Sequence, residues 1–203
     1  MDQPTCPDVH VVPANEASWE DIQTVLGAAD YAHLCQCQRH VWADRRWFGM
    51  PFEERAFHLR EQTNAGDPDA PQTSGVVAYL QDEPVGWCEV GPRSGYLRVR
   101  NSPVAWKGRS EDKDDDTVWS AVCFVVRRGY RGRHLTYDLA RGAADHARTG
   151  GARAVEGYPM ATVPGSEVTW GELNVGPLSA FLAAGFHEVT RPTLRRVVVR
   201  LDL

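Results

Sequence analysis

Seven short segments of the chain have the apolar pattern of β-strands, in which apolar residues either alternate with polar ones or run together. They are residues 9–12, 76–80, 85–90, 118–126, 152–157, 186–190 and 194–203. Only the turn Gln81-Asp82-Glu83-Pro84 separates the second segment from the third, which predicts a β-hairpin. The fourth segment is almost entirely apolar, as expected of a central strand that is buried on both faces.

Four other segments place apolar residues at the three- and four-residue spacing of a helix. They begin near Ser18, Pro51, Leu135 and Pro177. Strands and helices then follow in the order strand, two helices, three strands, helix, strand, helix and two strands. This order predicts a mixed α/β (α+β) fold, in which helices cover both faces of a sheet.

The length of 203 residues suffices for one domain with a substantial core, and we expect a single domain over residues 1–203. Three polar or aromatic-rich segments, at about 28–50, 92–116 and 159–173, fall outside the predicted elements. We interpret them as elaborations of the domain. The acidic run 111–116 is expected to be a solvated loop.

The charge balance argues against a polyanionic partner. Twenty-two basic and 27 acidic residues give a net charge of −5, so we expect neither nucleic acid nor a membrane surface as partner. The first residues do not resemble a secretory signal, and no apolar run reaches the roughly 18–20 residues that span a bilayer. Five cysteines, at 6, 35, 37, 88 and 123, are an odd number, so we expect free thiols and a cytoplasmic protein.

The segment with the clearest chemistry directly follows the predicted central strand. Residues 127–136, Arg-Arg-Gly-Tyr-Arg-Gly-Arg-His-Leu-Thr, combine four arginines with two glycines and lead into a helix. Free N–H groups at a helix N-terminus bind anions such as a pyrophosphate. The segment lacks the Gly-Lys-Ser/Thr of a Walker A loop and the spacing Gly-x-Gly-x-x-Gly, which disfavours nucleoside-triphosphate and dinucleotide sites.

This segment resembles the acetyl-CoA loop of the GNAT superfamily of N-acetyltransferases, whose motif is Arg/Gln-x-x-Gly-x-Gly/Ala. Arg131 matches the first position, whereas His134 and Thr136 stand where the family usually has Gly and Gly/Ala. Residues 174–186 resemble a second motif, Asn-x-x-Ala-x-x-x-Tyr-x-x-x-Gly-Phe, and keep its Asn, Gly and Phe.

The resemblance covers about residues 8–203 and implies the fold of that family, a mixed, mostly antiparallel seven-stranded sheet. It implies that acetyl-CoA is the acyl donor and binds where two central parallel strands, 118–126 and 153–158, splay apart. In this arrangement the backbone of 124–126 faces the pantetheine, and the amides of 131–136 face the pyrophosphate. The residues assigned to acetyl-CoA binding are Phe124, Val125, Val126, Arg131, Gly132, Arg133, His134, Leu135, Thr136, Asn174 and Phe181.

Transfer to an amine needs a base that takes the amine proton, and an acid can protonate the leaving thiolate. The usual acid of the family is a Tyr at the position of Phe181, so the acid is either absent, a water or another group such as Tyr158. As the base we consider Glu89 and Glu156, because a carboxylate inside an apolar strand has a raised pKa. The alternatives are a solvent-facing Glu89, a Glu156 paired with an arginine such as Arg153, and a Tyr158 that only packs.

No metal is expected. His33, Cys35, Cys37 and His40 place four metal-ligating side chains within eight residues, but a tetrahedral site closed by one octapeptide would be strained.

The resemblance implies transfer of an acetyl group from acetyl-CoA to the amine of a small molecule, by direct attack in a ternary complex. The alternatives are a non-catalytic or regulatory CoA-binding module, suggested by His134, Thr136 and Phe181, and transfer to a protein or peptide. The net acidic charge slightly favours a cationic acceptor, and the resemblance also allows a homodimer.

Overall fold

The computed structural model describes residues 8–43, 46–162 and 170–203. Its strands form one seven-stranded sheet in the spatial order β1-β2-β3-β4-β5-β7-β6. Within the described residues, β4 and β5 are parallel neighbours and the other pairs are antiparallel, so the predicted mixed sheet is confirmed. The strands are β1 Val9–Pro13, β2 Val76–Leu80, β3 Glu83–Pro92, β4 Val118–Val126, β5 Ala154–Gly157, β6 His187–Thr190 and β7 Val198–Asp202.

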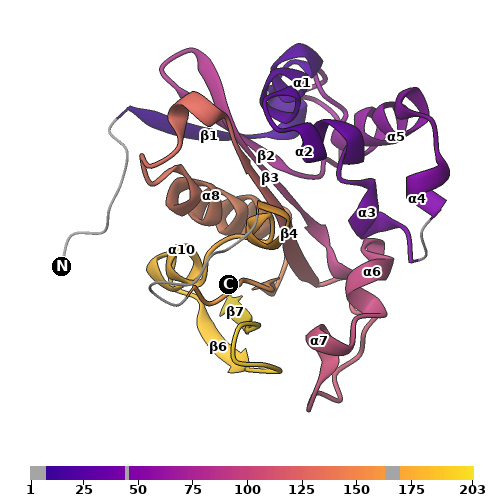
Figure 1. Cartoon of the computed structure of the whole chain (residues 1–203), viewed down its shortest axis with the longest axis vertical. Coiled ribbons are helices and arrows are strands. Elements are labelled where there is room, and N and C mark those ends of the chain that lie inside the picture. The colour runs from indigo at the N-terminus through magenta and orange to yellow at the C-terminus, as the bar shows by residue number, and fades with distance from the viewer. Residues whose placement is uncertain (1–7, 44–45, 163–169) are drawn as a thin grey trace.

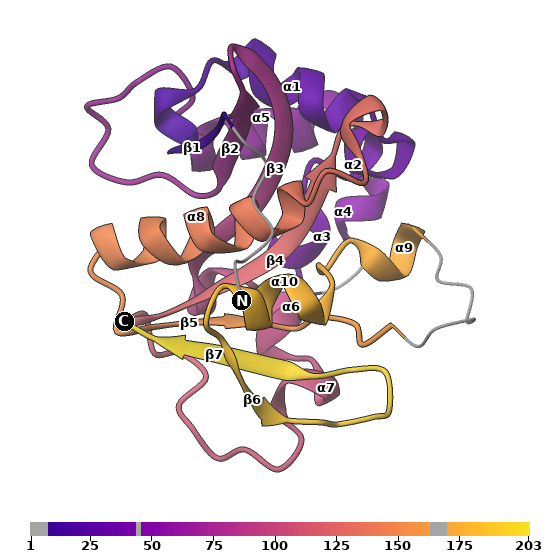
Figure 2. The ribbon, with the colours of Figure 1, turned by 90° about the vertical axis from the view of Figure 1, so that its left-hand side faces the viewer.

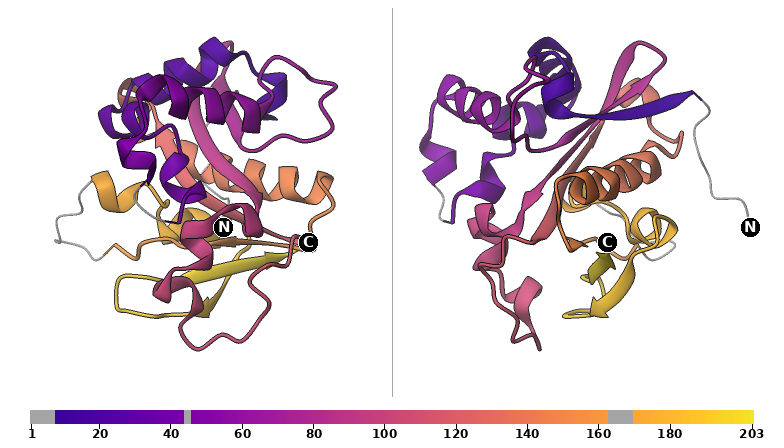
Figure 3. Two further views of the ribbon diagram at one scale, coloured as in Figure 1. Left: turned by 90° about the vertical axis from the view of Figure 1, so that its right-hand side faces the viewer. Right: turned by 180° about the vertical axis from the view of Figure 1, so that it is seen from behind.

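Helices cover both faces of this sheet, as predicted. Figure 1 shows α1, α2 and α5 on one side and α8 and α10 on the other, and Figure 3 shows the first group from its own side. The α-helices are α1 Trp19–Gly27, α2 Asp30–Cys35, α3 Gln38–Val41, α4 Arg46–Gly49, α5 Phe52–Thr63, α6 Leu97–Arg100, α7 Pro103–Trp106, α8 Leu135–Thr149, α9 Trp170–Leu173 and α10 Leu178–Ala183. Three 3-10 helices are η1 Ala14–Glu16, η2 Arg93–Gly95 and η3 Arg128–Tyr130.

Helix α8 lies along the sheet (Figure 2). The buried face of the helix is rich in alanine. Leu139, Ala143 and Ala147 repeat at helical spacing on that face and are fully buried. A Cβ at Gly142 would lie only 2.4 Å from Cγ1 of Val11, so this glycine allows the helix to lie close to β1. The packing fixes the N-terminus of α8 beside the end of β4.

The two central parallel strands separate partway along their length, as predicted. β4 pairs with β5 from Val118 to Ala121, and β4 continues to Val126 after β5 has ended. On the other side of β4, Glu89 of β3 lies opposite Cys123, while Val90 lies opposite Ala121. One residue of β4 is therefore extra, and this β-bulge falls where the strand leaves its parallel neighbour.

The three segments outside the predicted elements contain short helices. Segment 28–50 holds α2, α3 and α4, segment 92–116 holds η2, α6 and α7, and segment 159–173 holds α9. Residues 163–169 of the last segment lie outside the described residues. None of the helices in the described part of the chain is both long and apolar enough to cross a bilayer.

Candidate active site

A cavity of about 300 Å³ lies where β4 parts from β5, on the α8 side of the sheet. The end of β4, the loop after it and the first turn of α8 form its wall. The predicted acetyl-CoA-binding residues that line it are Phe124, Val126, Arg131, Gly132, His134, Leu135 and Thr136. We call this space the β4–α8 cavity.

The backbone of β4 at this cavity already has two partners within the chain. The N–H of Phe124 donates to the carbonyl of Asn174 at 2.7 Å. The carbonyl of Val126 accepts from Nε of Arg131 at 3.2 Å. Asn174, predicted from the second motif, thus reaches the site through its backbone.

Two of the predicted residues face elsewhere. The N–H of Arg127 donates to Val85 of β3, and alternation along the antiparallel ladder then directs the polar groups of Val125 toward β3 as well. Val125 therefore does not open into this cavity. Phe181 is fully buried in the core, where a Cβ at Gly157 would lie 2.3 Å from its ring.

The loop before α8 has a left-handed backbone conformation at His134, where the family motif usually has a glycine. His134 has a φ of 63°, in the left-handed region that favours Gly, and Gly132 has a φ of 77°. His134 precedes α8 and makes no side-chain cap hydrogen bond, so the first-turn N–H groups have no side-chain cap. Arg133 stacks on the ring of Tyr130 at 5.6 Å and adds positive charge to the loop. An anion at this helix end would find both donors and charge.

A second, narrow cavity of about 10 Å³ lies on the opposite face of β4, and we call it the β4–α3 cavity. Its lining residues are Tyr31, Ala32, Cys35, Cys37, Arg39, Cys123, Val125 and Asn174. Cys123 and Val125 alternate along β4 with the residues that line the first cavity. The space has room for about one water molecule, on the face of β4 opposite to the first cavity.

Glu89 lies behind the β4–α3 cavity. It is directly opposite Cys123 on the neighbouring strand, so the two side chains point to the same face. Its side chain is only 1% exposed; Oε1 accepts from the hydroxyl of Tyr96 at 2.8 Å, and Oε2 has no hydrogen-bond partner among the described residues. Burial raises the pKa of Glu89 to about 7, against the opposing effects of the Tyr96 and Ser74 hydroxyl groups. The solvent-facing alternative is thereby excluded.

Glu156, unlike Glu89, is surrounded by positively charged side chains. Its fully buried carboxylate pairs with Arg109 at 2.5 Å, Arg93 at 3.2 Å and Arg200 at 3.4 Å. The guanidinium groups of Arg93 and Arg109 also stack on the ring of Trp106, at 4.9 and 5.0 Å. The arrangement favours the alternative in which Glu156 is a paired, structural carboxylate.

Tyr158 belongs to the same internal network. Its hydroxyl donates to Oε2 of Glu156 at 3.1 Å and lies 3.0 Å from Oγ of Ser120. Burial raises the pKa of Tyr158 far above its usual range, and the charge of Glu156 raises it further. These contacts favour the alternative in which Tyr158 packs in the interior.

No sequence pattern indicated that arginines surround Glu156 or that Tyr96 contacts Glu89. Arg93, Arg109 and Tyr96 fall in the polar segment 92–116, which has no helix or strand periodicity, and Arg200 occupies a polar position of the last strand. The suggested Arg153 binds Asp115 instead, at 2.6 Å. A buried acid predicts that some cation must be near, but sequence spacing does not say which one.

The cysteine-rich segment forms part of the interior. Cys35, Cys37, Cys88 and Cys123 are buried free thiols, while Cys6 lies outside the described residues. The indole N–H of Trp87 donates to Sγ of Cys37 at 3.3 Å. In the part of the chain that the structure describes, no group of three or more His, Cys, Asp or Glu side chains is arranged to hold a metal ion.

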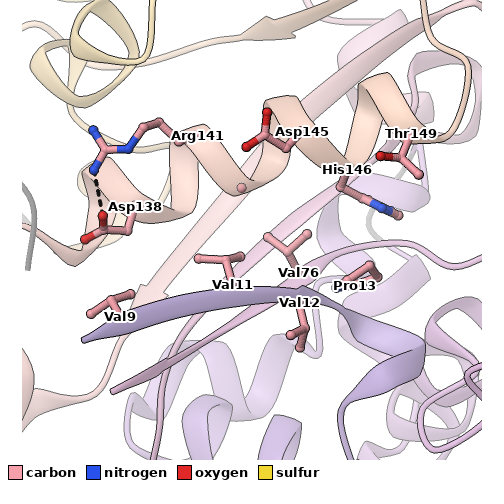
Figure 4. Close-up of a pocket in the computed structure, with 11 residues that line it drawn as sticks. Val9, Val11, Val12, Pro13, Val76, Asp138, Arg141, Asp145, His146 and Thr149 are labelled. Atoms are coloured by element: carbon pink, nitrogen blue, oxygen red, sulfur yellow. Dashed lines mark hydrogen bonds and ion pairs between the residues drawn. The ribbon is translucent and has the colours of Figure 1, made fainter. Parts of the chain in front are cut away.

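A further hollow of about 360 Å³ lies between β1 and α8 (Figure 4). Val9 and Val11 line its β1 side, and Arg141 pairs with Asp138 on the helix at 2.6 Å. The predicted catalytic and acetyl-CoA-binding residues do not line it. We therefore place the candidate site at the two cavities of β4.

Comparison with known proteins gives matches in structure. Neither a protein-family model nor the sequence of a curated protein matches the chain. Among solved structures, the fold is similar to that of yncA from Salmonella typhimurium, a proposed acetyltransferase solved with its cofactor acetyl-CoA. The TM-score is 0.55 at 13% identity, over 96% of this chain and 94% of that one.

Two further structures agree with this match. A GCN5-related N-acetyltransferase from Kribbella flavida has a TM-score of 0.53 at 19% identity, over 98% of this chain and all of that one. A proposed phosphinothricin N-acetyltransferase has a TM-score of 0.51 at 14% identity, over 96% and 98% of the two chains. The chain therefore has the GNAT fold, that of the GCN5-related N-acetyltransferases.

Proposed function

We propose that this protein is an N-acetyltransferase that moves an acetyl group from acetyl-CoA to the amine of a small molecule. One observation carries the proposal. Seven of the 11 residues assigned to acetyl-CoA binding line a single cavity, at the point where the central parallel strands separate. The fold supports it, since a neighbour with the same fold was solved with acetyl-CoA.

The residues of the β4–α8 cavity suit the donor. The first-turn N–H groups of α8 and the arginines of loop 127–133 supply hydrogen bonds and positive charge for a pyrophosphate. Phe124 and Val126 provide an apolar wall for the rest of the donor chain. Bound there, acetyl-CoA supplies an activated thioester.

We assign to Glu89 the role of the general base that takes the proton of the attacking amine. A carboxylate with a pKa of about 7 can accept a proton near neutral pH and still release it. Glu89 lies behind Cys37 and Cys123 and does not line the cavity. In this proposal a water molecule therefore passes the proton from the amine to Glu89. The leaving thiolate has no tyrosine at position 181, and the hydroxyl of Tyr158 is bound to Glu156. The thiolate therefore leaves unassisted or takes a proton from water.

The acceptor side supports a small molecule over a peptide. A groove for a protein lysine or N-terminus would be open and acidic. Among the described residues, the opening on the face of β4 opposite to the donor cavity has a volume of only about 10 Å³ and includes Arg39 in its wall, so it is not such a groove. Direct attack in a ternary complex is the mechanism that the resemblance of residues 127–136 to the GNAT acetyl-CoA loop implies.

The test is a transfer screen in which release of CoA thiol is measured with amines, amino acids, aminoglycosides and peptides. Transfer to a small amine is the expected result. Transfer to peptides alone would support a protein acetyltransferase, and binding of acetyl-CoA without any transfer would support a non-catalytic CoA-binding module. Absence of both binding and transfer would reject the proposal.

A further inference from the structure

The β4–α8 cavity has two chemically different ends. At one end lie Arg131 and the first-turn N–H groups of α8, which suit the phosphates of a donor. At the other end lie the uncharged side chains of Phe124, Leu173 and Pro177. Phe124 stands two residues deeper in β4 than Val126, so this apolar end is farther from the basic loop. A donor held by its phosphates therefore directs its acyl end toward Phe124.

The ring of Phe124 is fixed from behind. It packs edge to face against the ring of Phe181, with 5.3 Å between the ring centroids. Gly176, which has a φ of 80°, lies against both rings. A Cβ at this glycine would lie 3.0 Å from Cδ2 of Phe124 and 2.9 Å from Cε2 of Phe181. Because the packing behind Phe124 is already close, its ring cannot withdraw to enlarge the cavity without disturbing the core.

The gap between the separated strands gives little room for a longer acyl chain. The N–H of Phe124 donates to the carbonyl of Asn174 at 2.7 Å, so the segment after α9 takes the place of β5 beside this part of β4. The N–H of Met160 holds the same segment by donating to the carbonyl of Gly176 at 3.2 Å. On the opposite face of β4, the β4–α3 cavity has a volume of about 10 Å³, which suits one water molecule and no further methylene groups.

We propose that Phe124, together with Leu173, sets the acyl specificity of the donor site, so that acetyl-CoA binds well and acyl-CoA molecules with longer chains bind poorly. The inference rests on the proposed function and names the residues that select its acyl donor. Extra methylene groups in a filled pocket force side chains out of their preferred rotamers. One methylene group that a pocket does not accommodate changes selectivity by about 10- to 200-fold.

The experiment needs no acceptor. Isothermal titration calorimetry compares acetyl-CoA, propionyl-CoA, butyryl-CoA and CoA itself, which share every group except the acyl chain. We expect wild-type protein to bind butyryl-CoA about 10-fold or more weakly than acetyl-CoA, with propionyl-CoA between the two. CoA, which has no acyl group, should bind without this penalty.

Two variants connect the selectivity to the proposed wall. Phe124→Leu and Leu173→Ala each shorten one of its side chains, and each should reduce the ratio of the Kd of butyryl-CoA to the Kd of acetyl-CoA by about 5-fold or more. The ratio is measured within one preparation, so a smaller folded fraction does not change it. Leu173 is only half-buried, so its variant decides the matter if Phe124→Leu does not fold.

The matched control is Phe186→Leu. Phe186 is buried and also stacks on Phe181, with 5.0 Å between the ring centroids, but it does not line the cavity. Its replacement loosens the same core by the same change of side chain and should leave the ratio of the two Kd values unchanged. A selectivity that depended only on tight packing of the core would be lost in the control as well.

The outcomes separate the two proposals. Equal affinity of wild-type protein for the three acyl-CoA molecules would overturn the specificity inference, while binding of the donor stands. An unchanged ratio in the two wall variants, or an equal change in Phe186→Leu, would also overturn it. Absence of binding of all four ligands, by wild-type protein shown to be folded, would instead reject the proposed function.

Discussion

Glu89 on β3 and Glu156 on β5 lie on opposite sides of the central strand β4, and both are almost completely buried. Glu156 is surrounded by three arginines and accepts a hydrogen bond from Tyr158. Glu89 has no cation beside it in the described ion pairs; the hydroxyl of Tyr96 donates to one oxygen, and the other oxygen has no hydrogen-bond partner among the described residues. The comparison teaches that burial alone does not identify a catalytic acid or base, and that the partners of the buried group decide its role.

Removal of the charge of Glu156 should have the largest effect on stability. Glu156→Gln leaves Arg93, Arg109 and Arg200 without the buried carboxylate that they share, which should lower the free energy of unfolding by about 3–5 kcal/mol. Urea denaturation measures this change. The control is Glu111→Gln, because Glu111 pairs with the same arginines but is 39% exposed and should contribute less than about 1 kcal/mol. Equal effects of the two substitutions would remove the distinction.

The raised pKa of Glu89 should make the protein less stable as the pH rises, because the buried carboxyl is destabilised in its ionised form. Its pKa is about 7 in the folded protein and 4.5 as the ordinary value, so between these values the folded state holds a proton that the unfolded state has released. The free energy of unfolding therefore falls as the pH rises from about 4.5 to about 7, by up to about 3 kcal/mol.

Glu89→Gln should remove this part of the decline. Denaturation of wild type and variant at pH 5 and pH 8 measures it, and the variant should gain stability relative to wild type at the higher pH. A wild-type advantage that grows with pH would show that the Glu89 carboxylate is stabilised in its ionised form.

The same substitution should lower the rate of acetyl transfer. Loss of a general base costs about 100-fold or more in kcat/KM, and the rise of kcat/KM with pH near 7 should disappear in Glu89→Gln. Steady-state kinetics against pH, with the best acceptor from the screen, provides the measurement. An unchanged rate and profile would eliminate Glu89 as the base.

Tyr96 should tune Glu89 with a smaller effect. Its hydroxyl donates to Oε1 at 2.8 Å and lowers the pKa of the carboxyl, so Tyr96→Phe should move the rising limb of the kcat/KM profile to higher pH by about 1 unit or less. A shift to lower pH would contradict the account.

The sequence predicted the elements and their order because each carries a local signal. Ser18 caps α1 by accepting from the N–H of Asp21 at 3.0 Å, and the apolar run 118–126 coincides with β4. The loop before α8 was also located, since its glycines, arginines and helix start are adjacent in the chain.

The surroundings of the two glutamates could not be predicted in the same way. Glu156 meets Arg109, 47 positions earlier, and Arg200, 44 positions later, and these contacts depend on how the polar segment and the last strand fold over β5. Contacts between residues far apart in the chain produce no periodic sequence pattern. From the sequence alone, Glu89 and Glu156 were therefore equally good candidates for the base. Only tertiary contacts separate them.

Binding of acetyl-CoA to the β4–α8 cavity is the central claim, and isothermal titration calorimetry tests it without knowledge of the acceptor. We predict one acetyl-CoA bound per chain, with affinity reduced about 10-fold or more by Arg131→Ala, which removes a guanidinium from the cavity wall. Arg148→Ala, on the exposed surface of α8, should leave the affinity unchanged. Absence of binding at millimolar acetyl-CoA, by protein shown to be folded, would contradict the central claim.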